Sequence, residues 1–152
     1  MSPEAFKDGI KIKISSYKRQ TNNLVSRSKV NGNYVTSIMA LQEAMQEGYD
    51  EALLLDDENN ISEGSGENLF LVKDETLYTP DLAASLNGIT RKSIISLAEE
   101  DEIKVIVKKI NLNEILEADE LFFTGTAAEV VPIKKVDQNT ICLLYTSDAA
   151  DE

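Results

Sequence analysis

Short apolar segments alternate with polar, breaker-rich segments along the chain, and this alternation limits the folds that it can form. Ile10, Ile12 and Ile14 alternate with lysines, which is the period of a strand with one buried face. Pro132 predicts an edge or a bend in the last apolar segment. The further strands are predicted over Ala52–Leu55, Leu69–Val72, Leu77–Thr79, Ile103–Val107, Leu121–Phe123 and Val130–Ile133.

Helical periodicity occurs at three places between these strands. The first helix, which Gly48 ends, is predicted from the spacing of Tyr34, Ile38, Leu41 and Met45. Thr90 is the predicted N-cap of a second helix, whose apolar face consists of Ile94, Leu97 and Ala98. A short helix is predicted over Leu112–Ala118, and residues 15–33 and 80–88 are predicted loops. Because this order mixes hairpins with helical crossovers, we predict a mixed α/β fold.

Length and charge restrict the function. The 152 residues allow one ordinary domain with a core, and no apolar run approaches the roughly 18 to 20 residues of a membrane span. A net charge of −12 repels nucleic acids and anionic membranes, which proteins bind through clustered Lys and Arg. We therefore expect neither nucleic acid nor membrane as a partner.

The chain contains no histidine and only one cysteine, Cys142. This composition excludes Ser–His and Cys–His nucleophiles within the chain and leaves almost no ligands for a structural zinc, so we expect no metal site. A single cysteine forms no internal disulfide, and a cytoplasmic location is expected. A lysine whose pKa is lowered by its surroundings is the remaining candidate for a nucleophile.

The C-terminal residues Cys142–Glu152 resemble the conceptual translation of a sequencing adapter. We therefore expect residues 1–140 to form a truncated domain and residues 141–152 to be a non-native tail. The alternative is an ordinary frayed terminus. Without the tail's three acidic residues the net charge becomes −9, so the acidic character remains.

Four short segments combine small residues with a reactive or anion-seeking side chain. Lys29 ends a polar loop five residues before Tyr34. Glu63 lies in the sequence EGSGEN, where glycines within a strand-like region mark a bend or a close backbone approach. The other two segments are Gly88–Arg91, at the expected start of a helix, and Thr124–Ala128, after an expected strand.

Each segment alone has an ordinary structural explanation: a surface lysine, a turn, an N-cap and a strand end. Together they provide an amine nucleophile, a carboxylate for a ring nitrogen, a tyrosine hydroxyl and two turns suited to phosphate, the second through exposed N–H groups. These are the groups that pyridoxal 5'-phosphate requires. The nucleotide motifs GxGxxG and GxxxxGK[ST] do not occur.

The chain resembles branched-chain aminotransferases of the fold-type IV class over roughly residues 10 to 137. The resemblance is carried, in the family's order, by KVNGNY (29–34), EALLLD (51–56), SEGSGENLF (62–70), LYTP (77–80), GITR (88–91) and FFTGTAAEVVPI (122–133). It implies the large domain of that class, a mixed sheet or pseudo-barrel with flanking helices. It also implies transfer of an amino group between a branched-chain amino acid and 2-oxoglutarate, with pyridoxal 5'-phosphate as cofactor.

The resemblance also implies a role for individual residues. Lys29 would be the catalytic Schiff-base lysine, Tyr34 would bond the ring's phenolic oxygen, and Glu63 would pair with the ring nitrogen. Asn68 would lie near the support of Glu63, and Leu86 would pack on the ring. The phosphate would be bound by Ile89, Thr90, Gly125 and Thr126, and the substrate carboxylate would face Ala127 and Ala128.

Two alternatives remain at this point. The first alternative is a sister activity, because D-amino-acid aminotransferase and aminodeoxychorismate lyase share the fold and the lysine. The second is a non-catalytic acidic domain that binds a partner protein. The resemblance further implies that a smaller N-terminal domain is missing before Met1. We expect the fragment to turn over little alone and the full-length parent to be a homo-oligomer.

Overall fold

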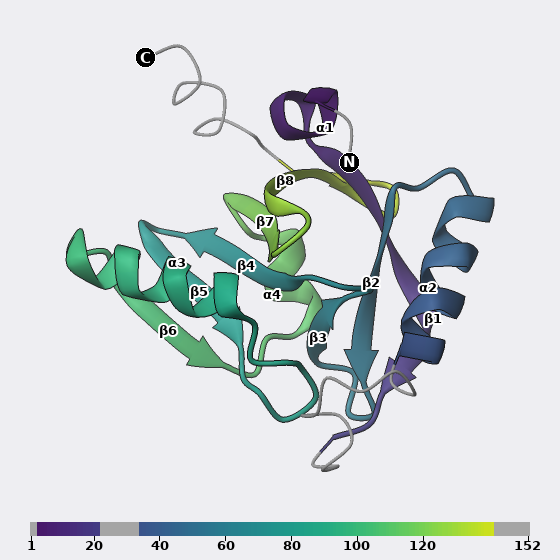
Figure 1. Ribbon diagram of the computed structural model, residues 1–152, viewed down its shortest axis with the longest axis horizontal. Coiled ribbons are helices and arrows are strands. Elements are labelled where there is room, and N and C mark those ends of the chain that lie inside the picture. Colours follow the sequence, from purple (N-terminus) through teal and green to yellow (C-terminus); the bar gives the residue numbers. More distant parts are fainter. Residues whose placement is uncertain (1–2, 22–33, 142–152) are drawn as a thin grey trace.

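The computed structural model describes residues 3–21 and 34–141 (Figure 1). The helices in this part are α1 (Pro3–Asp8), α2 (Tyr34–Gln46), α3 (Ile89–Glu100) and α4 (Leu112–Leu116). The strands are β1 (Ile10–Arg19), β2 (Glu51–Asp56), β3 (Ile61–Gly64), β4 (Asn68–Lys73), β5 (Thr76–Pro80), β6 (Val105–Lys108), β7 (Glu120–Gly125), β8 (Glu129–Val136) and β9 (Asn139–Thr140).

These strands form one mixed sheet in the order β3-β2-β1-β8-β7-β4-β5-β6, with β9 paired to β8. Strand β1 runs parallel to β2 and β8, and β5 runs parallel to β6, whereas the other pairs are antiparallel. In Figure 1, α2 lies beside β1 and β2, and α3 lies at the other end of the sheet, beside β4, β5 and β6. The predicted mixed α/β class is therefore confirmed.

The main core lies where the central strands meet. Ile12, Leu53, Phe123 and Ile133 have no exposed surface, and each comes from a different strand. Burial of such a side chain contributes roughly 1.5–3 kcal/mol. No helix in the described residues is both long and apolar enough to cross a membrane.

Strand β1 is longer than predicted, because residues 15–19 belong to the strand and not to a loop. The sequence there is polar, but Lys18 and Arg19 pair with Leu55 and Asp56 of β2. Pairing with a buried neighbour outweighs the weak local preference for a strand. The rest of the predicted loop, residues 22–33, lies outside the described residues.

Helix α2 forms where predicted and ends before Gly48, but the apolar residues whose spacing indicated the helix do not form its buried face. Ile38 and Met45 are 54% and 62% exposed, and the buried residues are Ser37, Ala40 and Ala44. The alanines pack against β2, where their small side chains allow the helix to lie close to the sheet. The larger apolar side chains of α2 consequently face outward.

Helix α3 begins one residue before the predicted cap. Its N-cap is Gly88, and no side chain caps its first turn, so the prediction of Thr90 as N-cap is wrong. Ile94 and Ala98 pack against the sheet as expected, whereas Leu97 is 55% exposed. A helix of 12 residues with a mostly polar surface needs only a narrow apolar stripe.

Pro132 lies in β8, an interior strand of the sheet, at a point where the strand is paired on one side only. It pairs with Phe122 of β7, and the pairing of β8 with β1 begins only at Ile133. Its missing N–H therefore leaves the β1 ladder intact. Ile141 is buried and donates its N–H to the Lys134 carbonyl at 2.8 Å, so the fold extends at least to this residue. The predicted tail beyond it lies outside the described residues.

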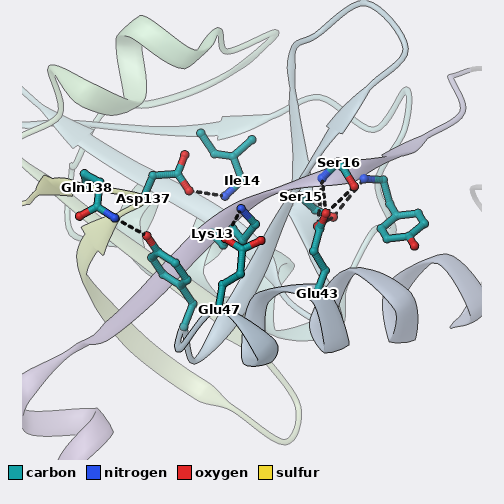
Figure 2. A network of polar contacts seen from close by, with 10 residues as sticks. Lys13, Ile14, Ser15, Ser16, Glu43, Glu47, Asp137 and Gln138 are labelled. Atoms are coloured by element: carbon teal, nitrogen blue, oxygen red, sulfur yellow. Dashed lines mark hydrogen bonds and ion pairs between the residues drawn. The ribbon is translucent and has the colours of Figure 1, made fainter.

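Polar contacts fasten α2 to β1, as Figure 2 shows. Glu43 of α2 accepts hydrogen bonds from the Ser15 hydroxyl at 2.6 Å and from the Ser16 N–H at 3.0 Å. One turn further along, Glu47 forms an ion pair of 2.9 Å with Lys13, but its side chain is 53% exposed. Only the first contact places a charged acceptor on a buried hydroxyl.

We expect Glu43→Ala to lower the free energy of unfolding by about 1–2 kcal/mol, because the buried Ser15 hydroxyl loses its acceptor. Glu47→Ala is the matched control one helical turn away, and exposed ion pairs contribute between about 0 and 1 kcal/mol. Urea denaturation of the two variants measures the difference. Equal losses in both would contradict the proposed role of Glu43.

Candidate functional site

A cavity of about 250 Å³ lies where α2 and α3 begin and where β3, β4 and β7 meet. Its wall comes from segments that are far apart in the sequence. The lining residues are Arg19, Tyr34, Glu63, Ser65, Gly66, Glu67, Asn68, Leu86, Asn87, Gly88, Ile89, Thr90, Thr124, Gly125 and Thr126.

Eight of the residues predicted to bind a cofactor line this one cavity, namely Tyr34, Glu63, Asn68, Leu86, Ile89, Thr90, Gly125 and Thr126. Lys29 lies outside the described residues, so its catalytic role stays a prediction. Ala127 and Ala128 are not in the cavity wall: Ala127 is exposed, and Ala128 packs into the main core. Their role toward a substrate also stays a prediction.

Glu63 is the best-anchored acidic group of the cavity. One carboxylate oxygen accepts the Leu86 N–H at 2.9 Å, and the other lies 3.1 Å from the Arg19 guanidinium. Burial raises the pKa of Glu63, while the Arg19 charge and the Leu86 N–H act in the opposite direction. The carboxylate is thus held in a fixed position with two partners and little water.

The loop between β5 and α3, residues 81–88, is held against β4 by a close fit. The Asn68 side-chain amide donates to the Leu86 carbonyl at 2.8 Å. A Cβ at Gly88 would lie 2.3 Å from Oδ1, the side-chain oxygen of Asn68, so no larger residue fits there without displacing Asn68. Buried Arg91 also holds this loop, since its guanidinium donates a hydrogen bond to the Pro80 carbonyl, where the loop begins, at 3.2 Å.

The first turn of α3 opens into the cavity through Gly88, Ile89 and Thr90. No side chain caps this turn, and it contains no acidic residue. Free N–H groups and the helix dipole together favour an anion at such a position. Gly125 and Thr126, at the end of β7, line the same cavity and add a backbone turn and a hydroxyl.

A pair of acidic residues, Glu51 and Glu67, lies beside Glu63. Glu51 is 5% exposed, and its carboxyl group shares a hydrogen bond with that of Glu67. Burial and then the charge of Glu51 raise the pKa of Glu67 from 4.5 to about 7, and Glu63 adds to this effect. Burial also raises the pKa of Glu51. Two carboxyl groups in contact cannot both be ionised cheaply, so the pair holds a proton near neutral pH.

The sequence reasoning missed several residues of the cavity wall. Arg19 lies in a segment that was predicted to be a loop, and Glu67 belongs to a recognised motif but received no role. Thr124 is 1% exposed, and within the described residues its hydroxyl has no hydrogen-bond partner. For Glu67, the available signal was its position four residues after Glu63, because the turn between them brings the two side chains close together.

In the described part of the chain, no group of three or more acidic or cysteine residues could hold a metal ion.

We expect stability to fall as the pH rises from about 4.5 to 7.5. The raised pKa values of Glu51 and Glu67 mean that the folded chain keeps protons that the unfolded chain releases in this range. For Glu67 the loss is on the order of 1–3 kcal/mol. Urea titrations at several pH values measure it.

Glu67→Gln should flatten this pH dependence, because the amide stays neutral and can still donate to Glu51. The matched control is Glu99→Gln on the exposed side of α3, which should leave the dependence as it is. An unchanged slope in Glu67→Gln would rule out a shared proton at this pair.

A family model described as amino-transferase class IV matches residues 1–136. The branched-chain-amino-acid aminotransferase of Pseudomonas aeruginosa is 51% identical over 142 residues, which are 93% of this chain and 46% of that protein. The Escherichia coli (strain K12) enzyme of the same name is 43% identical over 139 residues, which are 90% of this chain and 45% of that protein. The chain thus spans about half the length of the curated relatives it matches.

Solved structures agree with this assignment. The branched-chain amino acid aminotransferase of Escherichia coli has a TM-score of 0.90 at 41% identity, over 93% of this chain and 47% of that one. The T.th. branched-chain amino acid aminotransferase with pyridoxamine 5'-phosphate has a TM-score of 0.89 at 40% identity, over 97% and 52%. The same enzyme complexed with N-(5'-phosphopyridoxyl)-L-glutamate has a TM-score of 0.84 at 44% identity, over 88% and 46%. The chain belongs to the amino-transferase class IV family, and its fold is that of the branched-chain aminotransferases.

Proposed function

We propose that this chain is the cofactor-holding part of an enzyme that transfers an amino group between a branched-chain amino acid and 2-oxoglutarate. One observation carries the proposal: buried Glu63 and the uncapped start of α3 line the same cavity. A carboxylate for a ring nitrogen and an anion site for a phosphate are the two fixed points that pyridoxal 5'-phosphate needs. The names of the similar enzymes support the choice of substrate.

The residues of the cavity fit this cofactor. Glu63 would pair with the pyridine nitrogen, and its two partners keep it from turning away. The phosphate would be bound at Ile89 and Thr90 of α3, at Gly125, which ends β7, and at Thr126, which follows it. Gly88 leaves room where a Cβ would collide with Asn68. Tyr34 would bond the phenolic oxygen, and Leu86 would cover the ring.

When bound, pyridoxal 5'-phosphate supplies a protonated ring that draws electrons from the substrate Cα. The chain's own residues would do the rest. Glu63 keeps the proton on the ring nitrogen, because a carboxylate at that point favours the charged ring. Lys29 would move the proton at its Nζ between the substrate Cα and the neighbouring carbon C4′ of the cofactor. The phosphate site holds the ring still, so that one lysine serves both steps.

The covalent role of Lys29 can be tested on the 152-residue chain. We expect borohydride reduction in the presence of pyridoxal 5'-phosphate to attach one phosphopyridoxyl group to Lys29. Lys29 Nζ would condense with the aldehyde carbon and release water, and borohydride would supply the hydride that reduces the resulting C=N bond to a stable amine. Peptide mass spectrometry locates the group. Lys29→Ala should lose the label and the accompanying visible absorbance.

Lys18→Ala is the control, since Lys18 lies on the exposed side of β1 and bonds Asn59 at 2.5 Å. It should keep the label at Lys29. Labelling spread evenly over the lysines would reject the assignment and favour a non-catalytic acidic domain.

The substrate class requires the full-length parent, because this chain spans about half of its relatives. We expect the parent to use L-leucine with 2-oxoglutarate and the 152-residue chain to turn over little or nothing. Assays with L-leucine, D-alanine and aminodeoxychorismate separate the three sister activities. A parent that prefers D-alanine or aminodeoxychorismate would refute the branched-chain assignment.

We also propose that the full-length enzyme is a cytoplasmic homo-oligomer. The exposed apolar side chains of α2 support the proposal that another part of the enzyme or a second subunit covers this helix. Val35, Ile38 and Met45 are each more than half exposed. The single cysteine supports a reducing compartment. Light scattering of the full-length parent measures its oligomeric state.

A further inference from the structure

The hydroxyl of Thr124 is buried and unsatisfied. The residue is 1% exposed, and its Oγ1 has no hydrogen-bond partner within the described residues. A buried hydroxyl that bonds nothing destabilises the fold, and native proteins leave few of them. A valine of the same shape would avoid that cost, so the hydroxyl needs another explanation.

Other buried hydroxyls nearby do have partners. Thr79 on β5 donates to the Leu69 carbonyl at 2.8 Å, Ser62 on β3 donates to the Ala84 carbonyl at 2.7 Å, and Ser85 donates to the Asp81 carbonyl at 2.8 Å. These three buried hydroxyls therefore find their acceptors within the protein. Thr124 differs from them in that it lines the cavity.

The position of Thr124 points to an anion. It pairs with Asn68 of β4 and directly precedes Gly125 and Thr126, which line the cavity with it. The uncapped first turn of α3 lines the same cavity. Two independent features, a helix start without a cap and a buried donor without an acceptor, thus line the same cavity. An anionic oxygen placed there would satisfy both.

We propose that the Thr124 hydroxyl is a further ligand-binding group, which donates a hydrogen bond to the phosphate of the cofactor. The proposal rests on the proposed function for the identity of that phosphate. Thr124 lies deeper in the wall than Thr126, since its side chain is buried whereas Thr126 is exposed. The hydroxyl therefore approaches the phosphate from the sheet side of the cavity.

Thr124→Val tests this with two readouts that move in opposite directions. The ligand-free 152-residue chain should melt a few degrees higher, because an unsatisfied buried hydroxyl is removed. Its affinity for pyridoxal 5'-phosphate should fall roughly tenfold or more, because a hydrogen bond to a charged group is lost. Its affinity for pyridoxal, which lacks the phosphate, should not change. Thr124→Ser keeps the hydroxyl and should bind pyridoxal 5'-phosphate like the unchanged chain.

Thr79→Val is the matched control, a second buried threonine in the same sheet whose hydroxyl has a partner. It should melt lower and keep its affinity for pyridoxal 5'-phosphate. If Thr124→Val melts lower as well, the hydroxyl has a structural partner and the inference is overturned. Equal losses for pyridoxal and its phosphate would also overturn it.

The same experiment separates this inference from the proposed function. If the unchanged chain binds pyridoxal 5'-phosphate and Thr124→Val binds it equally well, only the role of Thr124 fails. If the unchanged chain binds neither pyridoxal 5'-phosphate nor inorganic phosphate, the cofactor site itself fails and Thr124 fails with it. Inorganic phosphate that raises the melting temperature of the unchanged chain but not of Thr124→Val supports the inference without the cofactor ring.

Discussion

A charged carboxylate in a nearly dry site has to be paired, and the arrangement of the cavity follows from this need at Glu63. Its partners come from two segments that are far apart in the sequence: the end of β1, through Arg19, and the loop before α3, through Leu86. Asn68 holds that loop in place, and the loop sets where α3 begins. The extension of β1 beyond its apolar part, the position of the loop and the open helix end are thus linked through one acidic side chain.

The cavity combines this fixed acid with a pair that shares a proton. Glu51 and Glu67 lie next to Glu63, and their proton lowers the negative charge that Glu63 meets. Three ionised carboxylates so close together would repel one another and would compete for the same positive partner. The acidic surface of the chain, with a net charge of −12, provides no relief. Because one carboxyl group of the Glu51–Glu67 pair stays protonated, the site can contain three carboxyl groups although it needs only one that is ionised.

The sequence predicted most of what depends on neighbouring residues. Strand alternation located β1, and the glycine-containing segments located Glu63 and Gly125, because turn chemistry is local. The start of α3 was located to within two residues, with the wrong cap. It did not predict features that depend on distant partners. Arg19 is in a strand only because β2 pairs with it, and α2 buries its alanines only because the sheet lies close by. The hydroxyl of Thr124 looks like any strand threonine until the lack of a partner among the described residues around it is known. Lys29 was recognised from its motif, and its place relative to Glu63 stays a prediction.

The contact between Asn68 and Gly88 has a consequence for how related sequences can vary. The space between the two residues admits a hydrogen where a methyl group would overlap the asparagine oxygen. A larger residue at position 88 is compatible only with a shorter one at position 68, and the shorter one would give up its hold on Leu86. Neither position can drift alone. Among natural relatives, these two sites should therefore covary, and a pair of mutually compensating changes there would be accompanied by a new means of fastening the loop.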